Sequence, residues 1–302
     1  MSEILIKACS FVAIIVLGHV LRRIDFFKEG DFQVLSKIVL KITLPGAIVY
    51  SLAGKEINPS MLFISLIAIS VNLIYIGVMC LLNMRNSREV KAFDLLNISG
   101  YNIGNFTMPF VQSFLGGTGV LTVSLFDTGN ATICLGGAYS LAALVRSGEP
   151  FDIRRIVDKL VHSVPFMAYL VMLILGLFHL PLPSAVVTFA GIISNANAFL
   201  AMLMLGVGFK LSGDKSQILH IIKVLAVRYS FAFVFALACF FLLPMELEYR
   251  QALAIVLFSP IAAAVPAFTA ELKDDVGLSS AINSISILIS IVCIVALLLI
   301  ML

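Results

Sequence analysis

The apolar residues of this chain fall into ten long stretches that are separated by short polar connections. About 20 apolar residues are enough for a helix to cross the hydrocarbon core of a bilayer. The pattern therefore predicts ten transmembrane helices, numbered here as spans one to ten. They are expected at 3–21, 32–53, 60–83, 93–115, 118–145, 162–180, 184–209, 218–243, 249–271 and 277–301.

The composition agrees with this pattern. Hydrophobic residues make up 61% of the chain and charged residues 12%, which lies outside the range of soluble domains. The five cysteines lie in apolar stretches without a Cys-x-x-Cys pair, so neither a disulfide framework nor a metal site is expected. The predicted fold class is an all-α polytopic membrane protein.

Basic residues are concentrated in the connections that follow the odd-numbered spans. Short loops rich in lysine and arginine stay in the cytoplasm, so we expect a plasma (inner) membrane protein with both termini outside the cytoplasm. This topology accounts for the net charge of +3, and no nucleic-acid partner is expected. The odd connections and their edges hold Arg22, Arg23, Lys28, Arg85, Arg88, Lys91, Arg146, Arg154, Arg155, Lys159, Lys210, Lys215, Lys223 and Lys273, and the even ones hold Lys55 and Arg250.

The connection between spans five and six has a pattern of its own. From Phe151 to Lys159 it mixes apolar residues such as Ile153 and Ile156 with basic ones. This mixture is typical of a helix that lies on the membrane surface, and a plain linker fits it equally well.

The second half of the chain repeats landmarks of the first half at an offset of about 157 residues, as alignment of the two halves shows. Pro109 corresponds to Pro266 and Gly18 to Gly176. Because each half has an odd number of spans, the two halves must cross the membrane in opposite directions. Such inverted repeats are typical of secondary transporters, whose substrates bind where interrupted helices meet. We expect repeats at 1–145 and 162–302, joined by a cytoplasmic linker at 146–161.

Spans four and nine carry helix-breaking residues at corresponding positions, from Asn102 to Pro109 and from Pro260 to Pro266. Proline removes a backbone donor and leaves a carbonyl unpaired, and such groups are tolerated in a membrane only against protein or water. The breaks are therefore expected to line a cavity, where free N–H groups attract anions and free carbonyls attract cations. Ordinary kinks are the alternative.

The run Asn102 to Pro109 reads NIGNFTMP and resembles the Asn-x-Gly-x-x-Gly-x-Pro signature of the auxin efflux carrier family. The runs LPGAIVYSLAG in span two and SPIAAAVPAFTAEL in span nine resemble two further motifs of that family, and the resemblance covers all ten spans. It implies a fold like that of bile-acid sodium symporters and sodium/proton antiporters, with helices four and nine crossing at their prolines, and a homodimer.

By this resemblance Asn102 is the substrate-site asparagine, and Pro109 and Pro266 are the crossover prolines. The sequence departs from the family at Thr107, where glycine is usual, and at Ala201, where proline is common. The complete set of expected substrate-site residues is Asn102, Gly104, Asn105, Pro109, Asp127, Asn130, Ser259, Pro260 and Pro266.

Ionisable residues deep in a span are candidates for function, because burying a charge in a membrane is costly. Asp127 lies in the middle of span five and could carry a proton, help to hold sodium, pair with Lys41, or form a structural ion pair. Lys41, in span two, could instead attract an anionic substrate. Asp94, Arg228 and Glu271 are expected to have interfacial roles near the ends of their spans.

The leading function is a secondary transporter of a small organic anion, such as a carboxylate, with an ion channel or membrane receptor as the alternative. An enzyme is not expected, because the sequence contains no HExxH motif and no nucleophilic triad. It also contains no nucleotide-binding loop, so no cofactor is expected. Span nine offers mainly Ser259 and Thr269 as polar groups. Proton coupling through Asp127, or simple voltage-driven efflux of an anion, is therefore favoured over coupling to sodium. Membrane lipid is the expected surrounding.

Overall fold

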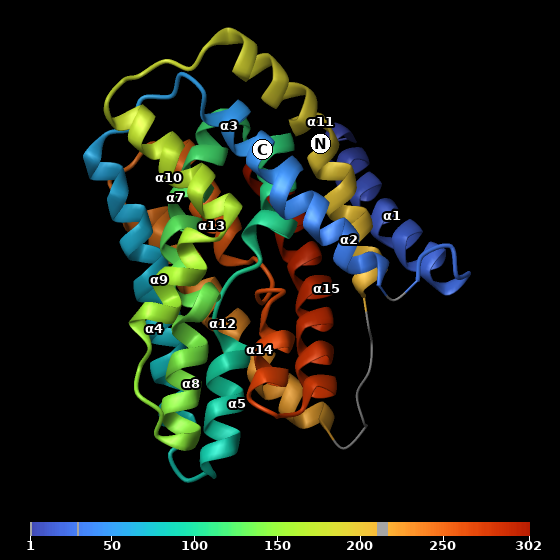
Figure 1. Ribbon diagram of the computed structural model, residues 1–302, viewed down its shortest axis with the longest axis vertical. Coiled ribbons are helices and arrows are strands. Elements are labelled where there is room, and N and C mark those ends of the chain that lie inside the picture. Colours follow the sequence, from blue (N-terminus) through green and yellow to red (C-terminus); the bar gives the residue numbers. More distant parts are fainter. Residues whose placement is uncertain (1, 29, 210–216) are drawn as a thin grey trace.

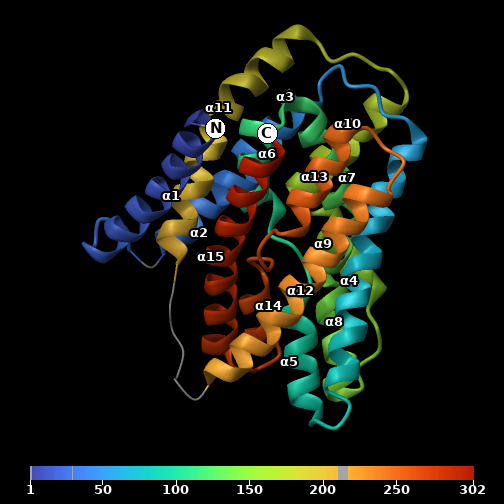
Figure 2. The same ribbon diagram turned by 180° about the vertical axis from the view of Figure 1, so that it is seen from behind.

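The protein is all-helical. The computed structural model describes residues 2–28, 30–209 and 217–302, and among these 82% are helical and none forms a strand. Lys210 and Lys215, which contributed to the predicted topology, lie outside the described residues. Both ends of the chain lie at the same end of the molecule (Figure 1 and Figure 2).

The described helices follow the predicted apolar stretches closely. In the first half they are α1 (Ser2–Arg23), α2 (Asp31–Ile38), η1 (Val39–Thr43), α3 (Leu44–Leu52), η2 (Pro59–Leu62), α4 (Phe63–Leu82), α5 (Arg88–Ile98), η3 (Ile103–Thr107), α6 (Met108–Phe114), α7 (Gly116–Thr132), η4 (Ile133–Gly137) and α8 (Ala138–Ser147). In the second half they are α9 (Ile153–Val161), α10 (Val164–Leu177), α11 (Ser184–Gly208), α12 (Ile218–Leu242), α13 (Leu247–Leu257), α14 (Val265–Glu271) and α15 (Val276–Met301).

Among the described residues, seven continuous helical segments are long and apolar enough to cross a membrane. An eighth results if α9 and α10, which are bent by 78° relative to each other, are taken as one span. These helices are those of a multi-pass membrane protein. The two predicted spans that do not appear among them are spans four and nine.

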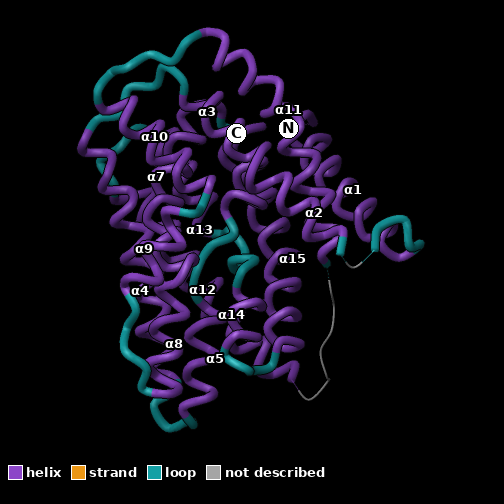
Figure 3. The backbone as a smooth tube through the Cα atoms, viewed as in Figure 1, coloured by secondary structure: helices purple, strands orange, loops and turns teal. Residues whose placement is uncertain are grey.

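Spans four and nine are interrupted, as the sequence predicts. The first interruption, residues 99–102, separates α5 from η3 and α6, and the second, residues 258–264, separates α13 from α14. Both appear as loop segments in the middle of the molecule (Figure 3). Both begin before the predicted positions. The first also ends at Asn102, so residues 103–109, which are expected to belong to it, are helical. Gly100 explains the earlier start of the first, because its φ of +77° is a conformation that favours glycine.

The helices pack mainly in two groups. One group, named here the α1–α11 group, contains α1, α2 with α3, α10 and α11. The other, the interrupted-helix group, contains the two interrupted helices together with α4, α7, α8, α12 and α15. In Figure 1, α1, α2 and α11 lie along one edge of the molecule, away from α4, α5 and α8.

Helices α1 and α11 are in direct backbone contact. A Cβ atom on Gly206 would lie 2.0 Å from the carbonyl oxygen of Ile15, and one on Gly18 would lie 2.4 Å from that of Leu203. Small residues of this kind let membrane helices approach closely. The α1–α11 contact therefore requires glycine on both helices.

The predicted helix in the linker is confirmed as α9, and its position on a membrane surface stays a prediction. Arg155 of α9 forms an ion pair with Glu271 at the end of α14. Arg146 of α8 pairs with Asp274 just beyond α14. The linker between the two halves is thus attached to the second interrupted helix.

Candidate functional site

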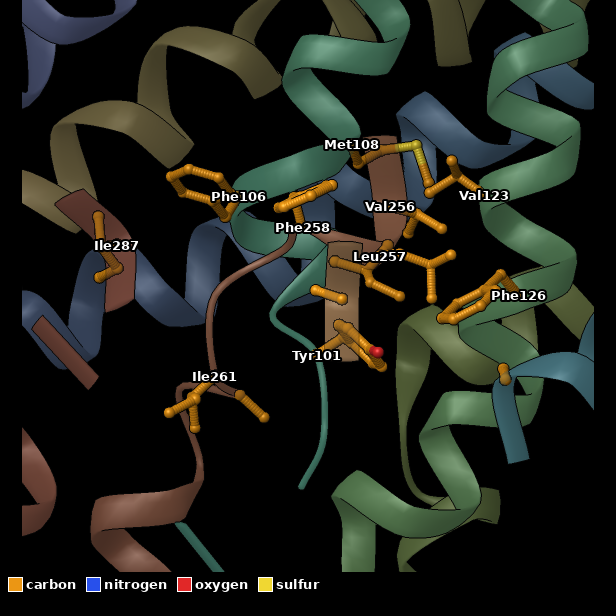
Figure 4. Packing of buried hydrophobic residues seen from close by; sticks show 14 of the residues in the cluster. Tyr101, Phe106, Met108, Val123, Phe126, Val256, Leu257, Phe258, Ile261 and Ile287 are labelled. Carbon is orange, nitrogen blue, oxygen red and sulfur yellow. The ribbon is translucent and has the colours of Figure 1, made fainter. Parts of the chain in front are cut away.

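The two interruptions meet. The backbone N–H of Asn102 donates a hydrogen bond of 2.8 Å to the carbonyl oxygen of Pro260. Figure 4 shows the two extended segments, one through Tyr101 and the other through Ile261, passing near each other within the apolar core. We call this contact the crossover.

The two prolines expected at the crossover lie beyond it. Pro109 lies where the π-helical turn Ile103–Thr107 runs into α6. Pro266 is in the first turn of α14, where proline is well tolerated because the first backbone N–H groups of a helix have no partner within it. The contact itself is made by Asn102 and Pro260, which precede these helices.

Two asparagines on neighbouring helices pair with the backbone of the first interruption. Asn130 of α7 accepts a hydrogen bond from the Tyr101 N–H and donates one to the Tyr101 carbonyl, both at 3.0 Å. Asn72 of α4 accepts from the Gly100 N–H at 2.7 Å. These amides replace the helical hydrogen bonds that the interruption removes, as buried backbone in a membrane protein requires.

Helix α15 does the same for the second interruption. Asn283 donates to the carbonyl groups of Ile261 and Ala262, at 3.0 and 3.2 Å. Ser286 accepts from the Ile261 N–H at 3.1 Å. Each interruption is therefore held in its extended form by polar side chains of neighbouring helices, α4 and α7 for the first and α15 for the second.

Arg228 of α12 reaches the crossover, so its predicted role at the membrane interface is wrong. The side chain is only 1% exposed. Its guanidinium donates to Ile98 and Gly100 carbonyls at 2.5 and 2.9 Å and to Ser259 and Pro260 carbonyls at 3.1 and 3.4 Å. The prediction failed because the acceptors are carbonyls of two distant segments, which no local pattern reveals.

Asp94 is also buried rather than interfacial. It is 0% exposed, and it pairs with His220 and with Lys223, whose ammonium nitrogen lies 2.9 Å away. Asn83 donates to the same carboxylate at 2.9 Å. Asp94 thus ties α5 to the beginning of α12, the helix that carries Arg228.

A cavity of about 330 Å³ adjoins the crossover. It lies between α2 of the α1–α11 group and α7 of the interrupted-helix group, and α10 closes one side. Its lining includes Phe32, Ser36, Leu40, Tyr101, Asn102, Gly104, Asn105, Asp127, Asn130, Cys134, Tyr169 and Ala263.

A second cavity, of about 340 Å³, lies against α1, α11, α14 and α15. It shares Phe32, Asn102 and Ala263 with the first cavity. Its polar lining consists of Arg22, Gln33, Asn102, Ser280, Asn283 and Ser284. Asn102 therefore lies on the wall of both cavities.

Two residues that line the first cavity carry amide atoms with unused hydrogen-bonding capacity. Within the described part of the chain, Asn102 Nδ2 and Asn105 Oδ1 are buried and have no hydrogen-bond partner. Leaving such atoms unpaired costs about 1–3 kcal/mol each. One is a donor and the other an acceptor, so a bound polar molecule could satisfy both.

Asp127 lies in the same cavity and is held by neutral groups. Its carboxylate accepts from Asn130 at 3.0 Å and from the Tyr169 hydroxyl at 3.1 Å. No Lys or Arg of the described ranges forms an ion pair with it. Lys41 is exposed and is not part of the cavity lining, so the two coupling candidates are not brought together.

The other expected site residues are distributed around the crossover. Gly104 lines the first cavity and Pro266 the second. Pro109 is buried within α6, and the Ser259 hydroxyl is hydrogen-bonded to that of Thr107. Sequence reasoning missed Arg228 in its true role, as well as Asn72 and Tyr169. The sequence feature that could have identified these three residues is a polar or charged side chain in the middle of an apolar stretch.

No protein-family model matches this chain, and no curated protein matches it. Its function is therefore inferred from the site.

Proposed function

We propose that the chain is a secondary transporter that carries a small organic anion across the membrane by alternating access. The observation that supports this most directly is the pair of buried, unpartnered amide atoms on Asn102 and Asn105, two residues that line the cavity where the interrupted helices meet. Polar atoms without partners at such a place are typical of a substrate site in a secondary transporter.

The proposal includes the ten-span arrangement. The two interrupted helices, α5 with α6 and α13 with α14, become spans four and nine when they are added to the eight candidates. The halves 1–145 and 162–302 would then be inverted repeats, with both termini outside the cytoplasm of a plasma membrane. Membership of the auxin efflux carrier family, a homodimer and the lack of enzymatic activity belong to the same proposal.

The charges around the cavity favour an anion. Arg228 places a positive charge directly behind the crossover, and its guanidinium carbon lies 4.5 Å from the ring of Tyr101, which lines the cavity. Asp127 is the acidic residue of the lining. When Asp127 is protonated, the site keeps a net positive charge that a carboxylate would balance.

Repulsion between carboxylates supplies a mechanism for coupling to protons. Two unit negative charges roughly 6 Å apart repel by about 3 kcal/mol at an effective dielectric constant of about 20. An anionic substrate would therefore bind best together with a proton on Asp127. Transport of the two together is the form of coupling that we propose.

A polar contact made by Gln112 of α6 links the two packing groups at the end of the molecule opposite Phe32. The Gln112 amide donates to Ser194 of α11 at 2.9 Å and to Ser51 of α3 at 3.4 Å. Both cavities reach Phe32 near the start of α2. Ser51 lies at the other end of the same span, about 28 Å of helix away at 1.5 Å per residue. We infer that the substrate enters from the Phe32 end, and that the Gln112 contact has to break for it to leave the other way.

Counterflow in proteoliposomes tests this proposal. Vesicles loaded with an unlabelled small carboxylate are diluted into a trace of the same labelled compound, and a panel of mono- and dicarboxylates is compared. A transporter accumulates label transiently and in a saturable way. An ion channel or a receptor on the same scaffold gives no counterflow, and that result would overturn the proposal.

A further inference from the structure

The carbonyl ends of the two interrupted helices converge on one point. Ile98 is the last residue of α5, and Ser259 and Pro260 follow the end of α13. The last carbonyls of a helix have no partner within it and carry the negative end of the helix dipole. Two such ends directed at one point attract a cation, and in secondary transporters this is a common position for sodium.

In this protein a side chain already fills that position. The Arg228 guanidinium donates to four carbonyl groups, two from each interrupted helix. A guanidinium suits this role because its donors are fixed in a plane and it stays charged in proteins. The faces of Tyr75 and Tyr101 lie 5.4 and 4.5 Å from its central carbon, which adds further stabilisation of the charge.

The charge of Arg228 is not cancelled by an acid. Within the residues that the structure describes, no carboxylate forms an ion pair with it. The carbonyls compensate it only with partial charges, so a net positive charge stays buried at the crossover. The Pro260 carbonyl accepts from both Arg228 and the Asn102 N–H, so one carbonyl separates this charge from the residue at the substrate cavity.

We propose that Arg228 acts as a permanently bound cation, which takes the place of a coupling sodium ion and supplies the positive charge for anion binding. The second part rests on the function proposed above, whereas the first does not. Arg228 is a positioning residue in this scheme, because it acts on the substrate through the carbonyls and the cavity wall. A consequence is that removing the guanidinium exposes four carbonyl oxygens in a buried space, which is a ligand set suited to sodium.

The test measures thermal unfolding of the purified full-length protein in detergent. Unfolding temperatures are compared in NaCl, KCl and N-methyl-D-glucamine chloride at equal ionic strength, without any substrate. We expect the wild type to unfold at the same temperature in all three salts. Arg228→Ala should unfold roughly 5–10 °C lower in N-methyl-D-glucamine, because it leaves buried carbonyls unpaired, and it should recover part of this loss as sodium is titrated to saturation.

Three further variants separate charge from packing. Arg228→Lys keeps the charge and should stay insensitive to sodium, with a smaller loss than Arg228→Met, whose unbranched side chain is uncharged and one atom shorter than that of lysine. Arg250→Ala is the matched control, because Arg250 also donates to a backbone carbonyl, that of Phe240 at 2.9 Å, but lies away from the crossover. It should lose stability without gaining any response to sodium.

Several outcomes would overturn the inference. One is a saturable stabilisation of the wild type that is specific to sodium, because the carbonyl site would then be open to sodium in spite of Arg228. Another is an Arg228→Ala variant that is folded and insensitive to sodium. If that variant does not fold, equal unfolding temperatures for the Lys and Met variants would show that the charge is unimportant. Since no measurement uses transport, a failure of the proposed transport function would be seen separately, as a lack of counterflow.

Discussion

The backbone N–H of Asn102 is hydrogen-bonded to the carbonyl oxygen of Pro260, which joins the two halves of the chain at the crossover. Because the main chain of Asn102 makes this bond, the side chain is left for other uses. Its Nδ2 atom is buried and lacks a partner within the described residues. We therefore expect the main chain of this residue to contribute to stability and its side chain to contribute to binding.

Replacing Asn102 should accordingly affect binding more than stability. Asn102→Ala keeps the backbone bond and removes only the unpaired amide, so we expect an unchanged unfolding temperature and a KM for counterflow raised at least about tenfold, the equivalent of 1.4 kcal/mol. Asn130→Ala is the contrasting control. It removes both hydrogen bonds to the Tyr101 backbone and should lower the unfolding temperature clearly. Wild-type KM in Asn102→Ala would exclude this residue from the substrate site.

Asp127 should determine the pH dependence of transport. With the wild type, anion counterflow should rise as the pH falls from about 8 to about 5, because protonation of the carboxyl removes its repulsion of the substrate. Asp127→Asn should remove this dependence and leave transport at a constant level, since an amide can still accept from Tyr169. Tyr169→Phe, which keeps the acid, should retain a pH-dependent profile. An unchanged profile in Asp127→Asn would exclude Asp127 from coupling.

The contact of Gln112 with Ser194 should open during each transport cycle. In a background without the native cysteines, Gln112→Cys combined with Ser194→Cys can be joined by a short bifunctional maleimide. We expect joining to stop counterflow almost completely while the protein still binds its substrate, whereas each single variant treated in the same way should stay active. Normal counterflow in a fully cross-linked sample would show that this contact does not need to open.

The backbone contact between α1 and α11 should tolerate no side chain. Gly206→Ala would place a Cβ atom 2.0 Å from the Ile15 carbonyl oxygen, so the two helices would have to separate. The yield of folded protein should fall strongly, as measured by size-exclusion chromatography in detergent. Gly77→Ala is the control, because nothing lies within 4 Å of a Cβ atom at that position, and it should behave like the wild type. Equal yields of the two variants would contradict the close packing.

Much of the helical layout could be predicted from the sequence. Long apolar stretches and helix-breaking residues have local causes, so the single helices and the two interruptions appear where the pattern indicates. The interruptions begin earlier than expected, because a glycine at 100 with positive φ ends the first half-helix before the proline does.

The partners of the buried polar residues could not be predicted in this way. Arg228 and Asn72 bond to the backbone of segments far away in the chain, and only the packed structure brings these groups together. Lys41 lies within the π-helical turn Val39–Thr43, which shifts the side chains around the helix relative to a regular α-helix. A helical wheel, which assumes a regular α-helix, therefore cannot predict the exposed position of Lys41.

The place of Asn102 on the wall of both cavities has a bearing on stoichiometry. Two carboxylates held by the same small amide group would lie close together and repel each other, so solutes in the two chambers would compete for it rather than bind independently. Each protomer would then move a single solute molecule per cycle, and its saturation curve would be a simple hyperbola even though the protein contains two hollows of similar size.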